Sequence, residues 1–182
     1  SDGIFIRALG KNGFSANISK AAVLNIHVKG IQAIRCDAEH LPLKDNSIDH
    51  ILFFEIFEHL PNPIAALKEL YRVCKKSVFL SIPYVTRTNI HRFNYNPSWP
   101  IYEHHIFEFN DEDFRKIVSH TGFKVDKFEV AKVLGGGSLF ERLVFLLWDF
   151  LRIFYRDPEY KNNPFYIVGE SYAGISAFPK SH

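Results

Sequence analysis

Methionine is absent from this 182-residue sequence, and cysteine occurs only twice, as Cys36 and Cys74. An intact translated chain normally begins with methionine, so the count indicates a fragment or methionines that went unrecorded. Two cysteines are too few for a disulfide framework, and the start of the sequence shows no signal peptide. We therefore expect both cysteines to be buried thiols in a reducing compartment, and we predict a cytoplasmic protein.

The sequence also lacks an excess of charge of either sign. Its 22 Lys and Arg against 20 Asp and Glu leave a net charge of +2, which gives no global electrostatic argument for a nucleic-acid partner. The apolar fraction of 47% excludes a disordered chain, and neither a collagen-like repeat nor a low-complexity linker is present. We predict one globular domain over residues 1–182 that binds no nucleic acid.

Apolar patterns of strand length alternate with patterns of helix length. Residues 48–54 form a near-continuous apolar run, which is typical of a strand buried on both faces in a parallel sheet. Ser19, Asn62 and Asn110 are suited to cap helices, and Gly30 and Gly122 to end them. The pattern predicts an α/β sheet with helices on both faces. Its expected helices cover residues 4–11 and 20–29 and follow Asn62 and Asn110, and its strands lie within 31–36, 48–54, 77–82 and 123–133.

Polar residues follow each predicted strand of this sheet. In an open α/β sheet a ligand lies beyond the carboxyl ends of the strands, so these positions are the first candidates for a site. Short acidic and amide side chains can accept hydrogen bonds from ribose hydroxyls and from an adenine amine. The pattern predicts a nucleoside-bearing cofactor. The positions are Asp2-Gly3, Asn17-Ile18-Ser19, Asp37-Ala38-Glu39, Glu55 and Glu58-His59.

Four segments resemble, in order, motifs of class I S-adenosylmethionine-dependent methyltransferases. Residues 36–49, CDAEHLPLKDNSID, are similar to the family's D-A-x-x-L-P-F-x-D-x-S-F-D segment. The others are residues 54–60, FEIFEHL, residues 81–83 at the end of a strand, and residues 105–109 with Gly122-Phe123. The resemblance covers residues 3–133. It implies a Rossmann-like three-layer sandwich with a mostly parallel sheet, and S-adenosylmethionine as cofactor.

The resemblance also implies which residues bind this cofactor. Gly3 stands at the last glycine of the cofactor loop, where the backbone must approach the ligand closely. Asn17 replaces the acidic residue that usually binds the ribose hydroxyls, and Asp37 with Ala38 would meet the adenine. The predicted cofactor-binding residues are Asp2, Gly3, Asn17, Ile18, Asp37, Ala38, Phe54 and Glu55. The family's first strand and leading glycines are missing, and the segment before Asn17 is short, so we treat 182 residues as a lower bound on the domain.

Histidine has the pKa best suited to a general base for a weakly acidic acceptor. His59 follows a strand end, and His105 belongs to an aperiodic segment, residues 84–109, that is long enough to cover a site. We predict both as catalytic residues; the alternative is that His59 braces a loop and His105 packs beneath it. Glu58 and Glu103-His104 add ligand types, but adjacent residues rarely share one metal and no H-x-x-x-H or C-x-x-C spacing occurs, so we expect no metal.

Residues 169–174, GESYAG, are similar to the G-x-S-x-G nucleophile elbow and, with residues 163–166, resemble serine carboxypeptidases. In that arrangement the acid and the histidine follow the serine, and no acidic residue follows Ser171. We therefore expect residues 165–168 and 174–178 to pair as a C-terminal antiparallel hairpin, with a turn between them. A serine hydrolase ranks third among the functions that we consider.

Residues 138–155 carry 13 apolar side chains in 18 and follow three glycines, Gly135–Gly137. Four charges argue against a transmembrane span, and a helix with so wide an apolar face needs a partner. We expect it to be inserted between the last two strands and to pack within the domain, in a homodimer or on a membrane surface. It would then border a pocket for an apolar or lipid-like acceptor.

The sequence thus predicts methyl transfer from S-adenosylmethionine to a small molecule, at oxygen rather than nitrogen or carbon. The alternative from another class is a non-catalytic module that keeps the cofactor fold for binding or as a scaffold. Asn17 and the incomplete glycine loop favour that alternative.

Overall fold

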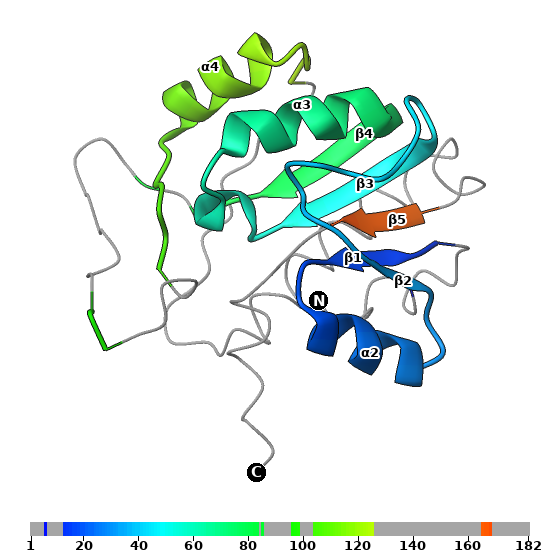
Figure 1. Ribbon diagram of the computed structural model, residues 1–182. Helices are drawn as coiled ribbons and strands as arrows, with labels where there is room; N and C mark the ends of the chain where they lie inside the picture. The colour runs from blue at the N-terminus through cyan, green and yellow to red at the C-terminus, as the bar shows by residue number, and fades with distance from the viewer. Residues whose placement is uncertain are drawn as a thin grey trace.

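The structure, a computed structural model, describes residue 6 and residues 13–83, 85, 96–98, 104–125 and 165–168. Within them lies one five-stranded sheet (Figure 1). Its strands are β1 (Ser15–Asn17), β2 (Ala33–Arg35), β3 (Ile48–Phe54), β4 (Cys74–Ser81) and β5 (Phe165–Val168). The order across the sheet is β2-β1-β5-β3-β4, and every pairing between these strands is parallel. The predicted Rossmann-like α/β class is therefore correct.

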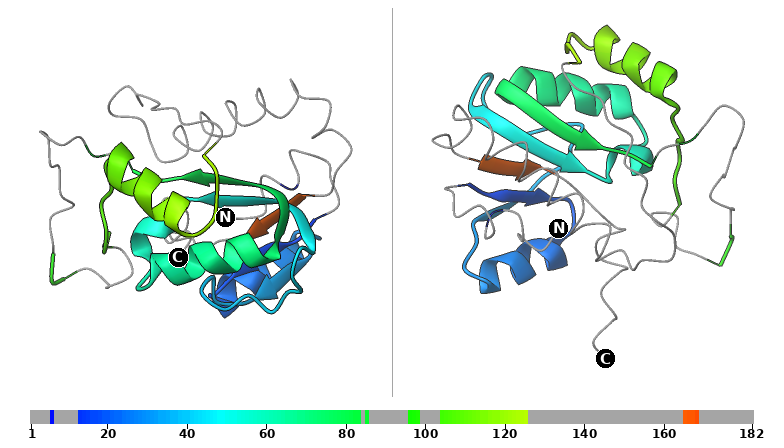
Figure 2. Two further views of the ribbon diagram at one scale, coloured as in Figure 1. Left: turned by 90° about the horizontal axis from the view of Figure 1, so that it is seen from above. Right: turned by 180° about the vertical axis from the view of Figure 1, so that it is seen from behind.

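Helices lie beside both halves of the sheet. They are α2 (Lys20–Val28), the 3-10 turn η1 (Phe57–His59), α3 (Pro63–Val73) and α4 (Asp111–His120). In Figures 1 and 2, α2 lies beside β1 and β2, α3 lies beside β3 and β4, and α4 lies next to α3. Among the helices that the structure describes, none has the length and apolarity needed to cross a membrane.

Capping residues fix where the helices start, as the sequence predicts. The side chains of Ser19, Asn62 and Asn110 each accept a hydrogen bond from the backbone N–H three residues later, at 3.3, 3.1 and 3.0 Å. Each such cap stabilises a helix by about 1 kcal/mol. Gly30 follows α2 with a φ of 74°, a conformation that glycine adopts without steric cost.

The core is centred on β3. Ile51, Leu52 and Phe53 are fully buried, which requires cover on both faces and explains the continuous apolar run. An aromatic cluster attaches α4 and the segment before it to this core: Phe57 lies 5.1 Å from Phe109 and 5.7 Å from Phe114, measured between ring centroids. These contacts hold η1 and residues 104–110 together at one end of the sheet.

The start of one predicted strand and the burial of one cysteine differ from the structure. β4 begins at Cys74, directly after α3 and three residues earlier than the sequence indicates. The second and third residues of β4 are Lys75 and Lys76, which are exposed, so the start of the strand has no apolar pattern in the sequence. Cys74 is buried, as expected, but Cys36 is only half-buried.

The strand predicted at residues 165–168 is present as β5, but its pairing differs from the hairpin that we expected. β5 lies between β1 and β3, and both pairings are parallel. Residues 174–178, the expected antiparallel partner, lie outside the described residues, as do residues 126–155 and all of the first predicted helix except Ile6. The proposed insertion of residues 138–155 therefore stays a prediction.

Candidate functional site

The carboxyl ends of the parallel strands define one edge of the sheet, which we call the carboxyl edge. β1 ends at Asn17, Asp37 is the second residue after the end of β2, and Glu55 is the first residue after β3. Because β1 pairs parallel with β2, and β5 joins β1 to β3, these three polar side chains reach the same edge. This is the edge at which open α/β sheets bind ligands.

Asn17 is nearly fully buried at this edge, with 2% of its surface exposed. Its Oδ1 accepts a hydrogen bond from the N–H of Ser19 at 2.8 Å, which fixes the orientation of the amide. Its Nδ2 is buried and donates to no atom among the described residues. An unsatisfied buried N–H group costs about 1–3 kcal/mol, so this donor fits a ligand that brings an acceptor.

Asp37 begins the segment that connects β2 to β3. Its Oδ1 accepts from the N–H of Glu39 at 2.9 Å, while Oδ2 lies 3.9 Å from Nδ1 of His40. Ala38, the next residue, is buried. The carboxylate is partly exposed and thus accessible to a ligand at the carboxyl edge.

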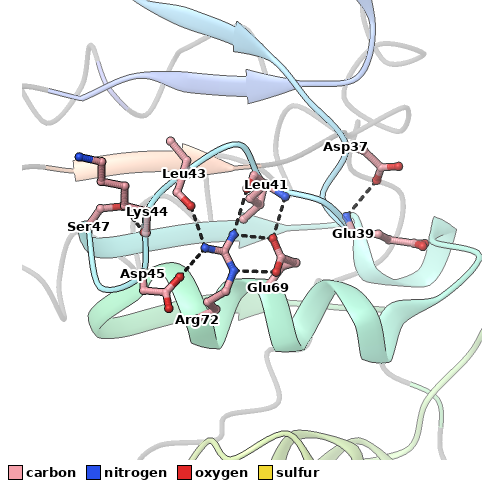
Figure 3. A network of polar contacts seen from close by, with 9 residues as sticks. All are labelled: Asp37, Glu39, Leu41, Leu43, Lys44, Asp45, Ser47, Glu69 and Arg72. Carbon is pink, nitrogen blue, oxygen red and sulfur yellow. Dashed lines mark hydrogen bonds and ion pairs between the residues drawn. The ribbon is translucent and has the colours of Figure 1, made fainter.

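Arg72 of α3 holds this segment in place (Figure 3). Its guanidinium donates to the carbonyl oxygens of Leu41 and Leu43 at 3.0 and 2.8 Å, and to the carboxylate of Asp45 at 2.7 Å. Glu69 accepts two further bonds from Arg72 and one from the N–H of Leu41. These contacts fix residues 37–46 on α3, and with them Asp37 and Ala38. We did not identify Glu69 and Arg72 from the sequence, although their i, i+3 spacing on a helix was visible.

Glu55 follows Phe54 at the end of β3 with a φ of 52°, in the left-handed region that non-glycine residues rarely adopt. Its N–H donates to the carbonyl of Ser81 at 3.2 Å, and its Oε1 accepts from the Ser81 hydroxyl at 2.9 Å. The end of β4 therefore orients Glu55. Strain of this kind is concentrated at binding sites, which is consistent with a functional role.

The turn η1 places Glu58 and His59 next to the segment that carries His105. The carbonyl oxygen of Glu58 accepts from the N–H groups of Ile106 and Phe107 at 2.8 and 3.1 Å. His59 Nδ1 bonds to the carbonyl oxygen of His104 at 3.0 Å. The end of the aperiodic segment is thus attached to the carboxyl edge, 45 residues away in sequence from His59.

The rings of His59 and His105 meet edge to face, with centroids 5.0 Å apart. Burial lowers the pKa of His59, and the hydrogen bond to His104 opposes this shift without cancelling it. His59 is therefore a neutral imidazole near pH 7. The structure brings together the two histidines that the sequence nominated, and it adds Glu58, which is 1% exposed, as a third group.

Other candidate positions lie elsewhere. Asp2, Gly3 and residues 169–174 are outside the described residues. An open depression of about 530 Å³ is lined by Phe14, His27 and residues 30–34, at the amino ends of β1 and β2. It lies away from the carboxyl edge and none of the predicted site residues line it.

The fold is that of a Rossmann-like α/β protein whose carboxyl edge carries Asn17, Asp37 and Glu55. Comparison with known families specifies it further. Residues 2–82 match a family described as "Methyltransferase domain", and residues 118–178 match one described as "Serine carboxypeptidase". Residues 2–82 therefore resemble the domain of class I S-adenosylmethionine-dependent methyltransferases, and this resemblance implies S-adenosylmethionine as the methyl donor.

Individual proteins are similar to parts of this chain. A ubiquinone/menaquinone biosynthesis C-methyltransferase, UbiE, of Stenotrophomonas maltophilia is 27% identical over 124 residues, which are 63% of this chain and 47% of that protein. A methyltransferase of Haloferax volcanii, solved in complex with the methyltransferase activator Trm112, superposes with a TM-score of 0.62 at 20% identity and covers 75% of this chain and 64% of its own. A Thermotoga maritima methyltransferase, described as a possible histamine N-methyltransferase, gives a TM-score of 0.50 at 21% identity, covering 69% and 70%. The chain spans about half the length of the curated relative.

Proposed function

We propose that this protein transfers a methyl group from S-adenosylmethionine to a small-molecule acceptor. The observation that carries the proposal is Asn17, whose buried Nδ2 has no acceptor among the described residues and lies at the carboxyl edge. A ribose hydroxyl oxygen would satisfy it. The match of residues 2–82 to a methyltransferase domain supports the same conclusion.

The cofactor-holding residues that we propose are those that the sequence nominated. Asn17 ends β1 and Ile18 follows it, Asp37 and Ala38 lie after β2, and Phe54 ends β3 with Glu55 directly after it. Asp2 and Gly3 complete the set. Bound S-adenosylmethionine supplies a methyl group on a positively charged sulfur, which makes that carbon electrophilic. The chain's own task is to orient donor and acceptor, since positioning supplies most of the rate in such a displacement.

His59 and His105 are the proposed catalytic residues for an acceptor with an O–H group. His59 Nδ1 is bonded to a carbonyl oxygen, which can only accept, so this nitrogen carries the proton and Nε2 presents a lone pair. That lone pair can take up the acceptor's proton as its oxygen becomes methylated. Oxygen is our first choice of acceptor atom, although the relative from Stenotrophomonas is named as a C-methyltransferase.

We further propose that the acceptor is apolar or lipid-like. The name of the Stenotrophomonas relative refers to quinone biosynthesis, and residues 138–155 supply 13 apolar side chains in 18. The same segment is our candidate for a homodimer contact or a contact with a membrane surface. The cytoplasmic location and the lack of a nucleic-acid partner remain predictions from composition.

The proposal is tested by calorimetric titration with S-adenosylmethionine, followed by transfer of a labelled methyl group to phenolic and quinol acceptors. We expect saturable binding, and a methylated product whose mass-spectrometric fragments place the methyl on oxygen. Ring methylation would support transfer but correct the acceptor atom. Absence of heat at saturating ligand would contradict the proposal and favour a non-catalytic scaffold.

A serine hydrolase is a second candidate, because one structural feature favours it. β5 is a parallel strand inside the sheet, and the sequence GESYAG, which is similar to the motif of a nucleophile elbow, follows it directly along the chain. The family match over residues 118–178 points the same way. Labelling of Ser171 by a fluorophosphonate, lost in Ser171→Ala, would establish this activity, whereas an unlabelled protein would eliminate it.

A further inference from the structure

Three side chains with metal-ligating atoms converge at the carboxyl edge. Glu58 and His59 come from η1 and His105 comes from the segment before α4, and one ligand atom from each lies within 4.8 Å of the other two. We propose that Glu58, His59 and His105 form a binding site for a divalent transition metal, for which zinc is the best match. Two imidazoles and one carboxylate form a ligand set that zinc uses where its fourth position stays open.

This inference reverses the expectation from sequence spacing. Adjacent residues rarely ligate one metal because they point in different directions along a regular helix or strand. η1 is a single 3-10 turn, and it leaves His59 Nε2 only 3.9 Å from Glu58 Oε1. The third group comes from a segment more than 40 residues away, which no local spacing could reveal.

His59 has the hydrogen-bonding arrangement of a metal ligand. Its Nδ1 donates to the carbonyl oxygen of His104 at 3.0 Å, which leaves the lone pair on Nε2. The side chain is 7% exposed, and Nε2 is buried without a hydrogen-bond partner among the described residues. Metal-bound histidines are commonly oriented through the other ring nitrogen in this way.

Charge and geometry favour a cation at the same point. The Glu58 side chain is 1% exposed, and a divalent cation would place positive charge against this buried carboxylate. The bonds from Ile106 and Phe107 to the Glu58 carbonyl hold the His105 segment against η1. With zinc–ligand bonds of about 2.0–2.1 Å, neighbouring ligand atoms lie roughly 3.4 Å apart, so atoms that now lie within 4.8 Å of one another need to approach by up to about 1.4 Å.

A metal at this edge has a role if the proposed methyl transfer is correct. An acceptor oxygen in the open fourth position would lose its proton more readily, because a bound cation lowers the pKa of such a group. His59 would then act through the metal rather than by taking the proton itself. This role depends on the proposed function, but metal binding does not.

The test is titration of chelator-treated protein with zinc chloride by calorimetry, together with the visible absorption spectrum after loading with Co²⁺. We expect one equivalent of zinc per chain and the absorption bands of a tetrahedral cobalt site. Glu58→Gln, His59→Ala and His105→Ala should each weaken zinc binding by about 100-fold. The matched control is His27→Ala. It removes an exposed histidine of α2 that contacts Ala33 at the amino end of β2, so it should leave the affinity for zinc unchanged.

Zinc binding that is absent, or unchanged in Glu58→Gln and His105→Ala, would overturn the site. These two variants decide the result if His59→Ala fails to fold, because neither removes the buried His59 ring. A parallel titration of the metal-free protein with S-adenosylmethionine separates the two proposals. Cofactor binding without zinc binding overturns the metal site alone, and zinc binding without cofactor binding overturns the proposed function alone.

Discussion

Arg72 and Glu69 lie one turn apart on α3 and form a two-pronged ion pair, with Nε 2.8 Å from Oε1 and Nη2 2.7 Å from Oε2 (Figure 3). The hydrogen bonds from Arg72 hold the pKa of Glu69 below its usual value, and those from Glu69 raise the pKa of Arg72. The pair does not stand alone, because the same guanidinium also contacts two carbonyl oxygens and Asp45 of the segment that carries Asp37. The same contacts of Arg72 therefore stabilise α3 and position the segment of Asp37, a proposed cofactor-binding residue.

Arg72→Lys should destabilise the protein by roughly 1–2 kcal/mol and weaken binding of S-adenosylmethionine several-fold. A lysine ammonium cannot make the parallel pair of bonds or reach both carbonyl oxygens, and partial exposure keeps the loss modest. Urea denaturation and calorimetric titration measure the two effects. Lys116→Ala is the control: it removes an exposed i, i+3 ion pair at 3.2 Å and should change stability by less than about 0.5 kcal/mol. Equal effects of both substitutions would contradict a positioning role for Arg72.

Stability should fall as the pH falls from about 6.5 to about 4, because of His50. This side chain is fully buried, with Nδ1 2.6 Å from the Ser77 hydroxyl. Burial, followed by the positive charge of Lys76, lowers its pKa from 6.5 to about 4 against the opposing effect of Asp49. The unfolded chain thus takes up a proton at higher pH than the folded chain does. The loss reaches about 3 kcal/mol once the pH is below the folded-state value.

The contribution of His50 is isolated by comparing variants across that pH range. His50→Gln keeps a polar group near Ser77 and does not titrate, so its stability should depend less on pH than that of the unmodified chain. His120→Gln, which replaces an exposed histidine at the end of α4, is measured alongside as the control for loss of a histidine. Chemical denaturation at half-unit pH steps gives the slopes. Parallel slopes for His50→Gln and the unmodified chain would refute this assignment.

Local signals predicted most of the helices and strands, and they failed where exposed residues interrupt a pattern or where distant segments pair. Both ends of β3 were predicted correctly, because a strand that is covered on both faces needs a continuous apolar run. The caps at Asn62 and Asn110 were found because they depend on a few adjacent residues. The start of β4 was missed because Lys75 and Lys76 conceal it.

The site likewise contains residues that the sequence could indicate and residues that it could not. Asn17, Asp37 and Glu55 could be nominated because the carboxyl ends of parallel strands meet at one edge. The Glu58, His59 and His105 cluster could not be recognised, since it depends on how residues 104–107 return to η1. The place of β5 between β1 and β3 was equally hidden, because more than 100 residues separate β5 from β3 along the chain.

Ile167→Pro should destabilise the protein by about 3 kcal/mol or more. Ile167 is paired with Ser15 of β1 on one side and with Leu52 of β3 on the other, and proline removes its N–H from the sheet. Ile167→Val keeps both the backbone donor and a β-branched side chain, so it serves as the control and should change stability far less. Denaturation midpoints, with amide hydrogen exchange in β1 and β3, measure the effect. Equal midpoints and unchanged exchange would place residues 165–168 outside the sheet.

Asn17→Asp should bind S-adenosylmethionine more tightly, by several-fold to about tenfold. A carboxylate can still accept the N–H of Ser19, as Asn17 Oδ1 does at 2.8 Å, and it removes the buried Nδ2 that has no acceptor among the described residues. It also accepts charge-assisted hydrogen bonds from two ribose hydroxyls, and these are roughly twice as strong as those of an amide. The N-terminus of α2, which begins three residues after Asn17, also favours a negative charge nearby. Calorimetric titration measures the affinity, with Asn17→Ala as the matched variant that should lose most of it. An affinity that is the same in all three proteins would show that the cofactor does not bind at the end of β1.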